Sequence, residues 1–327
     1  MTAFQWPDAE PPIAVVGPTA TGKTDAALAL AERIGGEIIN ADSMQVYTGM
    51  DIGTAKPSAA ERERVPFHLL DLSTPDAQVT VAEWKRRAEA AISDIISRGK
   101  RPILCGGTGM YLRALLENWS LAETPADAGV RAELQRELET VGAAALHEQL
   151  RDIDPDSAAR LHPNDGMRIT RALEVFRVSG RTISALQAED KAAHTRRPAP
   201  VFGLDLPRAA LNERIERRVD GMMAAGLIAE VKSLLELGYN QTHGPMRSLG
   251  YKEIIEWLGG ALDRDAAVAL IKQNTRRYAK RQQTWFRAEV GLKWLDVSAL
   301  TSAQVAEELL ISLSGSSANS MRQSLAL

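Results

Sequence analysis

The sequence has a single cysteine, Cys105, and no run of 18 or more apolar residues. One cysteine excludes an intramolecular disulfide and a metal cluster held by several cysteines. Without a long apolar run, we expect no membrane-spanning helix. The first twelve residues lack the apolar core of a secretory signal, so we expect the chain to act in the cytoplasm.

Neither sign of charge is in large excess, because 39 lysines and arginines face 42 aspartates and glutamates, for a formal net charge of −3. This balance argues neither for nor against a nucleic-acid partner, so any basic surface must be local. The chain has 327 residues, of which 45% are hydrophobic and 25% charged. Such a chain is long enough for about two globular domains.

Strand-like and helical patterns alternate in the first 120 residues. Short apolar runs are typical of buried strands, and runs with helical spacing separate them: strands at 13–16, 37–41 and 102–105, helices at 24–33 and 80–98. This alternation predicts βαβ units and a parallel sheet.

The pattern changes near residue 121. Residues 127–190 show helical periodicity and no convincing strand. Strand patterns return at 201–206 and 292–297, on either side of a largely helical stretch at 208–287. We therefore expect a helical module that interrupts the sheet domain.

A phosphate-binding loop is predicted directly after the first strand. The pattern G-x-x-x-x-G-K-[ST] is formed by Gly17, Pro18, Thr19, Ala20, Thr21, Gly22, Lys23 and Thr24. Glycines at both ends let consecutive N–H groups point at one anion, and the following helix adds its positive end. The Lys23 ammonium suits terminal phosphate oxygens, and the Thr24 hydroxyl can ligate Mg²⁺. The alternative, a glycine-rich turn with a chance match, fits this strand-and-helix context poorly, although the motif does not name the ligand.

Together these features predict an α/β fold, with a P-loop NTPase-like parallel sheet core and an inserted all-helical module. The expected bounds are 1–120 for the first part of the core, 121–200 for the module, 201–312 for the resumed core and 313–327 for a serine-rich, disordered tail.

Asp42 is the one carboxylate expected beside the phosphates. It follows the strand pattern at 37–41, whereas the strand at 102–105 runs into Gly106 with no acidic residue. The carboxyl ends of parallel strands converge on one crevice, so both segments should face the loop at 17–24. On sequence alone, Asp42 is as well explained by a turn cap as by a catalytic base.

A block of cations and aromatic residues lies at 272–287. No acidic residue interrupts it, and its members are Lys272, Arg276, Arg277, Lys280, Arg281 and Arg287, interleaved with Tyr278, Trp285 and Phe286. A plain basic helix surface is one interpretation. In a chain of net charge −3, a phosphate track with stacking platforms for bases is the better one.

The sequence resembles the tRNA dimethylallyltransferases, the IPP transferase family, from about Ile13 to Val297. The resemblance is carried by seven blocks in order, GPTATGKT, INADSMQVYTGMDIGTAKP, GGTGMYLRALL, NDGMRITRALEV, RVDGMMAAGLIAEV, RSLGYKE and KRQQTWFR. One departure is Phe67-His68, where the family usually has two histidines, and this leaves the role of that loop open.

The resemblance implies transfer of a dimethylallyl group from its diphosphate to N6 of adenosine 37 in tRNA, with Mg²⁺ assisting. It implies that residues 17–24 hold the diphosphate of the donor, that Arg218 adds a second cation there, and that Thr24 ligates the metal. It also favours Asp42 as the general base. Without it, Arg218 would be assigned to a solvated helix face with Arg214 and Arg217.

The resemblance also implies contacts with the anticodon stem-loop of tRNA. They would be made by Asp42, Ser43, Met44, Gln45, Thr108, Arg131, Met167, Arg168, Ile169, Thr170, Arg171, Arg247, Ser248, Leu249, Gly250, Tyr251, Lys252, Lys280, Arg281, Gln282, Gln283, Thr284, Trp285, Phe286 and Arg287. Gln45 could read an adenine edge. We expect the chain to act as a monomer.

Three other functions share parts of this pattern. A P-loop small-molecule kinase would not need the basic block at 272–287. An isopentenyltransferase acting on free adenine nucleotides would not need the helical module. An RNA-binding protein without activity would not need Lys23, Thr24 and Asp42 together.

Overall fold

The computed structural model describes residues 11–119, 127–193 and 196–324. The chain divides into two compact units. Unit 1 comprises Met1–Leu115 and Arg197–Leu327, and unit 2 comprises Leu116–Arg196. Each unit has its own hydrophobic core.

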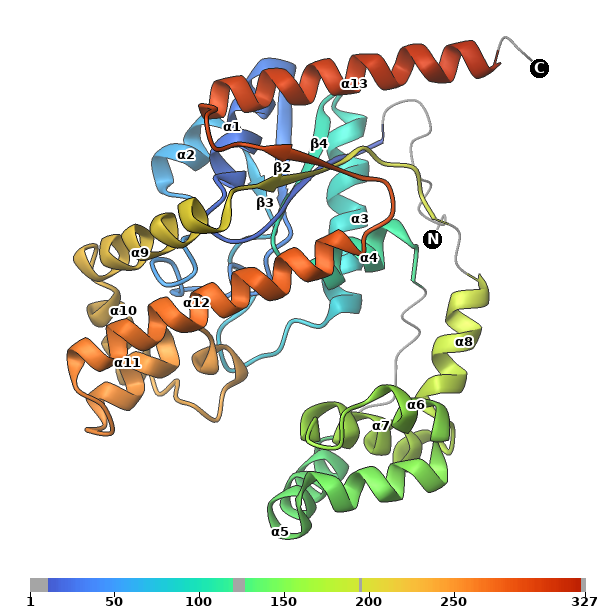
Figure 1. Ribbon diagram of the computed structural model, residues 1–327, viewed down its shortest axis with the longest axis vertical. Helices are drawn as coiled ribbons and strands as arrows, with labels where there is room; N and C mark the ends of the chain where they lie inside the picture. The colour runs from blue at the N-terminus through green and yellow to red at the C-terminus, as the bar shows by residue number, and fades with distance from the viewer. Residues whose placement is uncertain (1–10, 120–126, 194–195, 325–327) are drawn as a thin grey trace. The chain divides into compact units, whose positions relative to one another are not determined.

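Unit 1 contains a six-stranded sheet in the order β3-β2-β4-β1-β5-β6 (Figure 1). Every neighbouring pair is parallel, so the carboxyl ends of the strands lie along one edge. The strands are β1 (Ile13–Val16), β2 (Gly36–Asn40), β3 (Phe67–His68), β4 (Arg101–Gly106), β5 (Val201–Asp205) and β6 (Leu292–Asp296). This confirms the α/β class with a parallel sheet.

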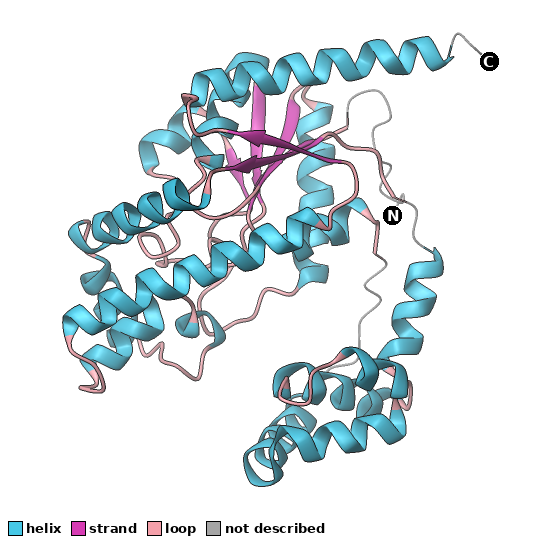
Figure 2. Ribbon diagram, viewed as in Figure 1, coloured by secondary structure: helices cyan, strands magenta, loops and turns pink. Residues whose placement is uncertain are grey.

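Helices cover the sheet (Figure 2). Successive residues of a strand point to opposite faces, yet all four residues of β1 are at most 1% exposed, so both faces are covered. The helices of unit 1 are α1 (Lys23–Ile34), α2 (Ala59–Arg64), α3 (Val81–Ser97), α4 (Gly109–Leu116), α9 (Arg208–Ala224), α10 (Leu227–Glu236), η1 (Gly244–Arg247), α11 (Tyr251–Leu258), α12 (Arg264–Arg287) and α13 (Ser302–Ser324).

The helix that follows the phosphate-binding loop is bounded by glycines. α1 begins directly after Gly22, whose φ of 86° is left-handed, and ends at Gly35, whose N–H donates to Ala31 O. Leu28 and Leu30 are buried in the same core as β1 and α13. The predicted strand, loop and helix at 13–34 are therefore confirmed.

Unit 2 is helical throughout its described residues. It contains α5 (Ala128–Ile153), which bends at Gly142, and then α6 (Pro155–Arg160), α7 (Gly166–Ser179) and α8 (Ile183–Ala193). Its core includes Leu134, Leu146, Leu150, Ile169 and Leu173. It interrupts unit 1 between Leu115 and Arg197, where the sequence predicts an inserted module at 121–200.

The serine-rich tail differs from its prediction. Residues 313–327 are expected to be disordered, but α13 continues to Ser324. Val305, Ala306 and Leu309 are buried in the unit 1 core, so packing supplies the helix nucleus. Once a nucleus exists, each further residue adds one hydrogen bond, which favours extension even of a serine-rich segment. Residues 325–327 lie outside the described part.

The short elements β3, α2 and α4 were missed by the sequence prediction. β3 has two residues, too few to show any periodicity. α2 has six residues, but it carries a readable signal: the Ser58 hydroxyl accepts from Glu61 N–H and the Glu61 carboxylate accepts from Ser58 N–H, a capping box. No helix among the described residues is both long and apolar enough to cross a membrane.

Candidate active site

The predicted phosphate-binding loop leaves the carboxyl end of β1. Gly17 has a φ of 137°, and a Cβ there would lie 2.5 Å from the carbonyl oxygen of Leu204, so only glycine fits. Inside the loop, the Pro18 carbonyl accepts from the Thr21 hydroxyl at 2.9 Å. The loop has the backbone shape that its sequence predicts.

Lys23 is a desolvated cation in this loop. Its Nζ donates to the Pro18 carbonyl at 2.7 Å. Burial, with a smaller contribution from the charge of Arg218, lowers the pKa of Lys23 to about 8, although Cys105 and the charge of Asp42 act in the opposite direction. Lys23 forms no ion pair with any carboxylate in the described part of the chain.

Arg218 is a second cation turned toward the same place. Burial lowers its pKa, and the nearby charges of Asp42 and Asp25 act against this effect. Its neighbour Arg217 is exposed and pairs with Glu213 at 2.9 Å, whereas Arg218 has no carboxylate partner among the described residues. The solvated-face interpretation therefore fits Arg217, whereas Arg218 is half-buried and lies near the charges of Asp42 and Asp25.

Asp42 sits in a turn beyond β2. Its Oδ1 accepts from Met44 N–H at 2.8 Å, and its own N–H donates to Asn40 Oδ1 at 3.0 Å. Its Oδ2 receives no hydrogen bond from the residues that the structure describes. Asp42 is therefore a turn cap through Oδ1, and its Oδ2 is not used in that turn.

The loop after β4 is joined to the Asp42 turn. Ser43 N–H donates to the Thr108 hydroxyl at 2.9 Å, and Thr108 N–H donates to Ala41 O at 3.1 Å. A Cβ on Gly106 would lie 2.2 Å from Ala41, so glycine permits this close approach. The prediction that the ends of β1, β2 and β4 form one site agrees with this arrangement.

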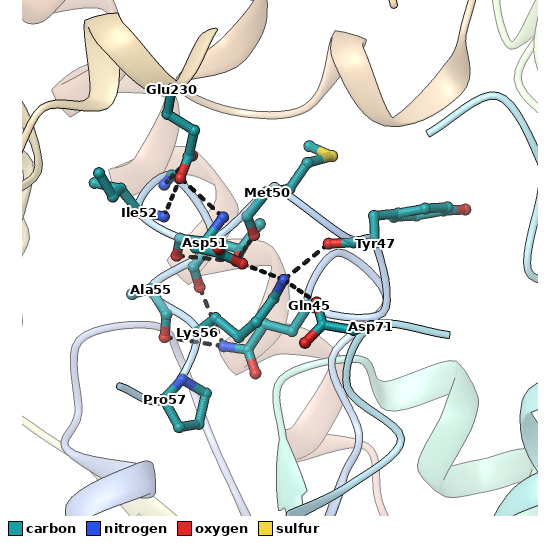
Figure 3. Close-up of polar contacts among 12 residues, drawn as sticks. Gln45, Tyr47, Met50, Asp51, Ile52, Ala55, Lys56, Pro57, Asp71 and Glu230 are labelled. Atoms are coloured by element: carbon teal, nitrogen blue, oxygen red, sulfur yellow. Dashed lines mark hydrogen bonds and ion pairs between the residues drawn. The ribbon is translucent and has the colours of Figure 1, made fainter. Parts of the chain in front are cut away.

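The segment after Met44 is held by the half-buried Glu230 and the buried Lys56 (Figure 3). The Glu230 carboxylate of α10 accepts from the N–H groups of Asp51, Ile52 and Gly53 at 3.0, 2.7 and 3.1 Å. Lys56 Nζ, with its side chain fully buried, donates to Tyr47 O at 2.8 Å. The sequence analysis missed both Glu230 and Lys56, because no local pattern reveals a charge whose partners lie elsewhere in the chain.

The same cluster constrains Gln45 and ties Lys56 to two acids. Lys56 Nζ also donates to Asp71 at 2.6 Å and to Asp51. Gln45 Nε2 donates to the carbonyls of Thr54 and Ala55, each at 3.1 Å. Gln45 thus uses its amide donor to hold the loop, and its Oε1 accepts no hydrogen bond from the described residues.

The basic helix α12 separates into outward and inward residues. Lys280, Arg281, Thr284 and Arg287 are exposed. Phe286 is 1% exposed and Gln282 is 6% exposed, so the prediction that they contact tRNA is corrected: their side chains pack inside unit 1. Gln283 Nε2 donates to Asp205 Oδ1 at 2.8 Å and anchors the helix to the end of β5.

The other two aromatic residues of α12 that are predicted to stack on bases, Trp285 and Tyr278, each contact an arginine of the protein. The Arg113 guanidinium lies over the Trp285 ring, 4.7 Å from its centroid, so one face of that ring is covered. The Arg281 guanidinium lies 5.8 Å from the Tyr278 ring centroid. Burial raises the pKa of the Tyr278 phenol, and the charge of Asp42 raises it further, which places Tyr278 near Asp42.

The segment 247–252 also contains both exposed and buried residues. Arg247 is exposed and Lys252 half-buried, as a surface contact requires, and Leu249 is half-buried between them. Gly250 and Tyr251 are buried, and the Tyr251 hydroxyl donates to Glu230 at 2.6 Å, so this ring packs in the protein and is corrected as a tRNA contact. The Ser248 hydroxyl donates to Pro245 O at 2.6 Å.

Unit 2 contains its own group of predicted tRNA-binding residues. Met167 is 82% exposed, and Arg168 is exposed beside it at the start of α7, with Thr170 half-buried. The prediction for Ile169 is corrected, because its side chain is fully buried in the unit 2 core.

The two remaining arginines of unit 2 that are predicted to contact tRNA share one buried acid. Arg131 and Arg171 donate to Glu174 at 3.0 and 2.7 Å. Burial of Glu174 opposes its ionisation, but Arg171 and Arg131 together hold its pKa below the ordinary value. The carboxylate therefore fixes two guanidinium groups on the surface of this unit.

Phe67-His68, whose role the sequence leaves open, forms the edge strand β3. His68 Nε2 lies 2.7 Å from Glu37 Oε2, and Arg98 donates to the same carboxylate at 2.7 Å. These contacts hold the edge strand β3 on β2.

A family model described as IPP transferase matches residues 45–289. The chain belongs to the IPP transferase family. It is 50% identical over 288 residues to tRNA dimethylallyltransferase 2 of Geotalea daltonii, covering 88% of each chain. It is 51% identical over 284 residues to tRNA dimethylallyltransferase of Geobacter metallireducens, covering 87% of this chain and 92% of that one.

Two solved structures resemble most of the chain. The tRNA isopentenylpyrophosphate transferase of Bacillus halodurans superposes with a TM-score of 0.68 at 39% identity, covering 93% of this chain and 95% of that one. A eukaryotic dimethylallyltransferase acting on tRNA superposes with a TM-score of 0.74 at 31% identity, covering 88% and 74%. Family membership excludes a P-loop small-molecule kinase and an RNA-binding protein without activity.

Proposed function

We propose that this IPP transferase transfers the dimethylallyl group of dimethylallyl diphosphate to N6 of adenosine 37 in tRNA and releases diphosphate. The observation that carries the proposal is the pair Lys23 and Arg218, two desolvated cations with no carboxylate partner in the described part of the chain. Desolvated cations need a compensating negative charge, and a diphosphate in the loop at 17–24 supplies it.

These cations suit the chemistry of the leaving group. As the bond between the dimethylallyl carbon and the diphosphate oxygen breaks, its electron pair stays on the oxygen. Lys23, Arg218 and the N–H groups of the loop other than Thr19 N–H, which donates to Gln282, would be the donors near that oxygen. Donors arranged in advance around developing charge are the largest single contribution to catalysis in many enzymes.

Asp42 suits the chemistry of the acceptor. The exocyclic amine of adenine is a weak nucleophile, and it must lose a proton as its bond to the dimethylallyl carbon forms. Asp42 Oδ2 takes that proton, while Oδ1 keeps the side chain oriented through Met44 N–H. A positioned base of this kind contributes typically ~10²–10⁴-fold to the rate.

The residues present fit a Mg²⁺ ion bound with the donor. Among the described residues no group of three His, Cys, Asp or Glu side chains could hold a metal alone. Mg²⁺ is usually bound through substrate phosphates with few protein ligands, and the Thr24 hydroxyl in the first turn of α1 is available for that role. When bound, the ion would neutralise charge on the diphosphate.

Cations on the surfaces of both units would hold the tRNA. On α12 these are Lys280, Arg281 and Arg287, and on unit 2 they are Arg131, Arg168 and Arg171. They would bind phosphates of the anticodon stem-loop while the target base leaves its stack to reach Asp42.

The test is incubation with dimethylallyl diphosphate, Mg²⁺ and bulk unmodified tRNA, followed by mass analysis of the nucleosides. The expected product is N6-dimethylallyladenosine in tRNA, with release of diphosphate. A parallel reaction with free AMP separates this function from that of a free-nucleotide isopentenyltransferase. Modification of AMP but not of tRNA would overturn the proposal.

A further inference from the structure

The side-chain amide of Gln282 joins two loops of the candidate active site. Its Oε1 accepts from Thr19 N–H at 2.8 Å, and its Nε2 donates to Gly107 O at 2.9 Å. A Cβ on Gly107 would lie 2.2 Å from that Nε2, so the glycine makes room for the amide. Gln282 thus bridges the phosphate-binding loop and the loop after β4, although it lies 175 residues from Gly107 in the sequence.

The contact to Thr19 also orients Lys23. Thr19 N–H and the Pro18 carbonyl belong to the same planar peptide unit, so fixing one fixes the other. The Pro18 carbonyl accepts from Lys23 Nζ at 2.7 Å and from the Thr21 hydroxyl at 2.9 Å. Gln282 therefore holds the peptide against which the phosphate-binding lysine is placed.

The same helix carries cations on its outer side. Lys280 and Arg281 immediately precede Gln282 on α12 and are exposed, whereas Gln282 is 6% exposed. α12 is one continuous helix from Arg264 to Arg287. Any displacement of the helix by a ligand on its outer side is thus transmitted to the amide on its inner side.

We propose that Gln282 is a positioning residue that sets the geometry of the phosphate-binding loop and couples RNA binding on α12 to diphosphate binding. This inference rests on the proposed function. It replaces the tRNA contact that the family resemblance implies for Gln282, because an amide that is only 6% exposed and bonded at both ends inside the protein is not placed to reach RNA.

The first experiment measures diphosphate binding by a variant that lacks the amide. Gln282→Met keeps the length of the side chain but removes both hydrogen bonds. With Mg²⁺ present, we expect the Kd for inorganic diphosphate and the KM for dimethylallyl diphosphate to rise roughly 5–30-fold. The Kd for an unmodified anticodon stem-loop RNA, measured without diphosphate, is expected to stay at its wild-type value.

Two further variants separate positioning from a general loss of stability. Gln273→Met makes the same substitution at an exposed site of the same helix and is expected to keep the wild-type Kd for diphosphate. Gln282→Glu retains an acceptor for Thr19 N–H but loses the donor to Gly107 and adds negative charge, so it should bind diphosphate more weakly than Gln282→Met. If Gln282→Met lowers only the melting temperature and leaves the Kd for diphosphate unchanged, the proposal is overturned.

The second experiment measures the coupling itself. The Kd for the stem-loop RNA is determined with and without saturating inorganic diphosphate, a pair that cannot react. Coupling between two binding sites is reciprocal, so the wild-type ratio of the two Kd values should differ from one, and in Gln282→Met it should move toward one. A wild-type ratio of one, or an unchanged ratio in the variant, contradicts the coupling. Failure of the wild type to modify tRNA would instead contradict the proposed function.

Discussion

Asp42 combines two roles that the sequence alone could not separate. One oxygen caps the turn through Met44 N–H, and the other is open to a proton from the acceptor. Asp42→Asn keeps an oxygen for the cap but cannot act as a base. We expect turnover to fall by at least ~10²-fold.

The same variant provides its own control. Because the cap is preserved, the melting temperature and the Kd for the anticodon stem-loop should match the wild type. Both are measured beside single-turnover rates of dimethylallyl transfer. A variant with normal turnover would remove Asp42 as the base.

Lys23 illustrates a conflict between stability and function. Its pKa is lowered from 10.5 to about 8, so the folded state binds fewer protons than the unfolded state between those values, and stability rises with pH across that window. Below pH 8 the protein bears the unfavourable free energy of desolvating the ammonium, of order 3 kcal/mol at most. Lys23→Met should therefore be more stable than the wild type at pH 7 by ~1–3 kcal/mol, as measured by urea unfolding.

The same lysine should give diphosphate binding a pH dependence. Wild-type affinity for diphosphate is expected to fall as pH rises through about 8, since Lys23 loses its charge there. Lys23→Met should bind weakly at every pH and lack this step. An identical step in the variant would assign the titration to another group.

For single residues, the sequence predicted positions correctly where the residue's contacts are made by its neighbours in the chain. Gly17 to Thr24 form a contiguous motif between a strand and a helix, and the structure places them as expected. Sequence reasoning could not find Gln282 or Glu230 in their actual roles, because their partners lie in distant segments. It also missed Lys56, whose partners Tyr47, Asp51 and Asp71 follow no regular spacing. It also misjudged Ile169, Tyr251 and Phe286, since a motif does not show which side of a helix faces inward.

Among the elements, α12 is expected to contribute the electrostatic part of tRNA binding. Lys280 and Arg281 are exposed on it, so Lys280→Gln with Arg281→Gln should reduce the salt dependence of stem-loop binding by ~0.7–0.9 in log–log slope for each RNA phosphate that is no longer neutralised. The control is Lys100→Gln with Lys232→Gln, an equal change of charge at exposed sites of the same unit. Equal slopes in the two double variants would place the RNA elsewhere.

In unit 2, Glu174 lies between Arg131 and Arg171. Its substitution is a test in which the change of charge and the change of arginine geometry predict opposite effects on RNA affinity. Glu174→Gln makes the chain more positive, which alone would tighten RNA binding. We expect weaker binding, roughly tenfold, because an amide oxygen cannot hold both Arg131 and Arg171. Glu133→Gln is the matched control, an exposed site in the same unit. Tighter binding by Glu174→Gln would show that the arginines need no fixed geometry.

Helix ends were predictable where a glycine in the sequence terminates the helix. Gly35 ends α1 and Gly180 ends α7, both with left-handed φ values. The two-residue strand β3 has no such signal, and its place depends on Glu37 and Arg98 on other segments. The helical tail after residue 313 depends on packing of the first turns of α13, which composition does not reveal.

For the whole molecule, the two residues of unit 1 that flank the inserted unit 2, Leu115 and Arg197, contact each other. Arg197 Nη1 donates to Leu115 O at 3.3 Å, so the chain leaves and re-enters unit 1 at one place. Replacing residues 118–196 with a short glycine–serine linker keeps all of α4. We expect cooperative unfolding and wild-type diphosphate affinity, but stem-loop affinity reduced by ~10²-fold or more, because one of two sets of contacts is gone.

Two measurements check this deletion. Thermal unfolding followed by circular dichroism reports the fold, and titration with diphosphate and with RNA reports the two binding sites. Loss of diphosphate binding in a folded deletion variant would mean that unit 2 contributes to the donor site.

The solitary thiol at the end of β4 makes the molecule convenient for spectroscopy. Cys105 is 7% exposed, and burial raises its pKa to about 12, so it stays protonated and unreactive at neutral pH. A second cysteine placed on an exposed helix of unit 2 would thus accept a maleimide fluorophore selectively, without first removing the native residue. The motions of that unit during catalytic cycles could then be followed in an otherwise unaltered enzyme.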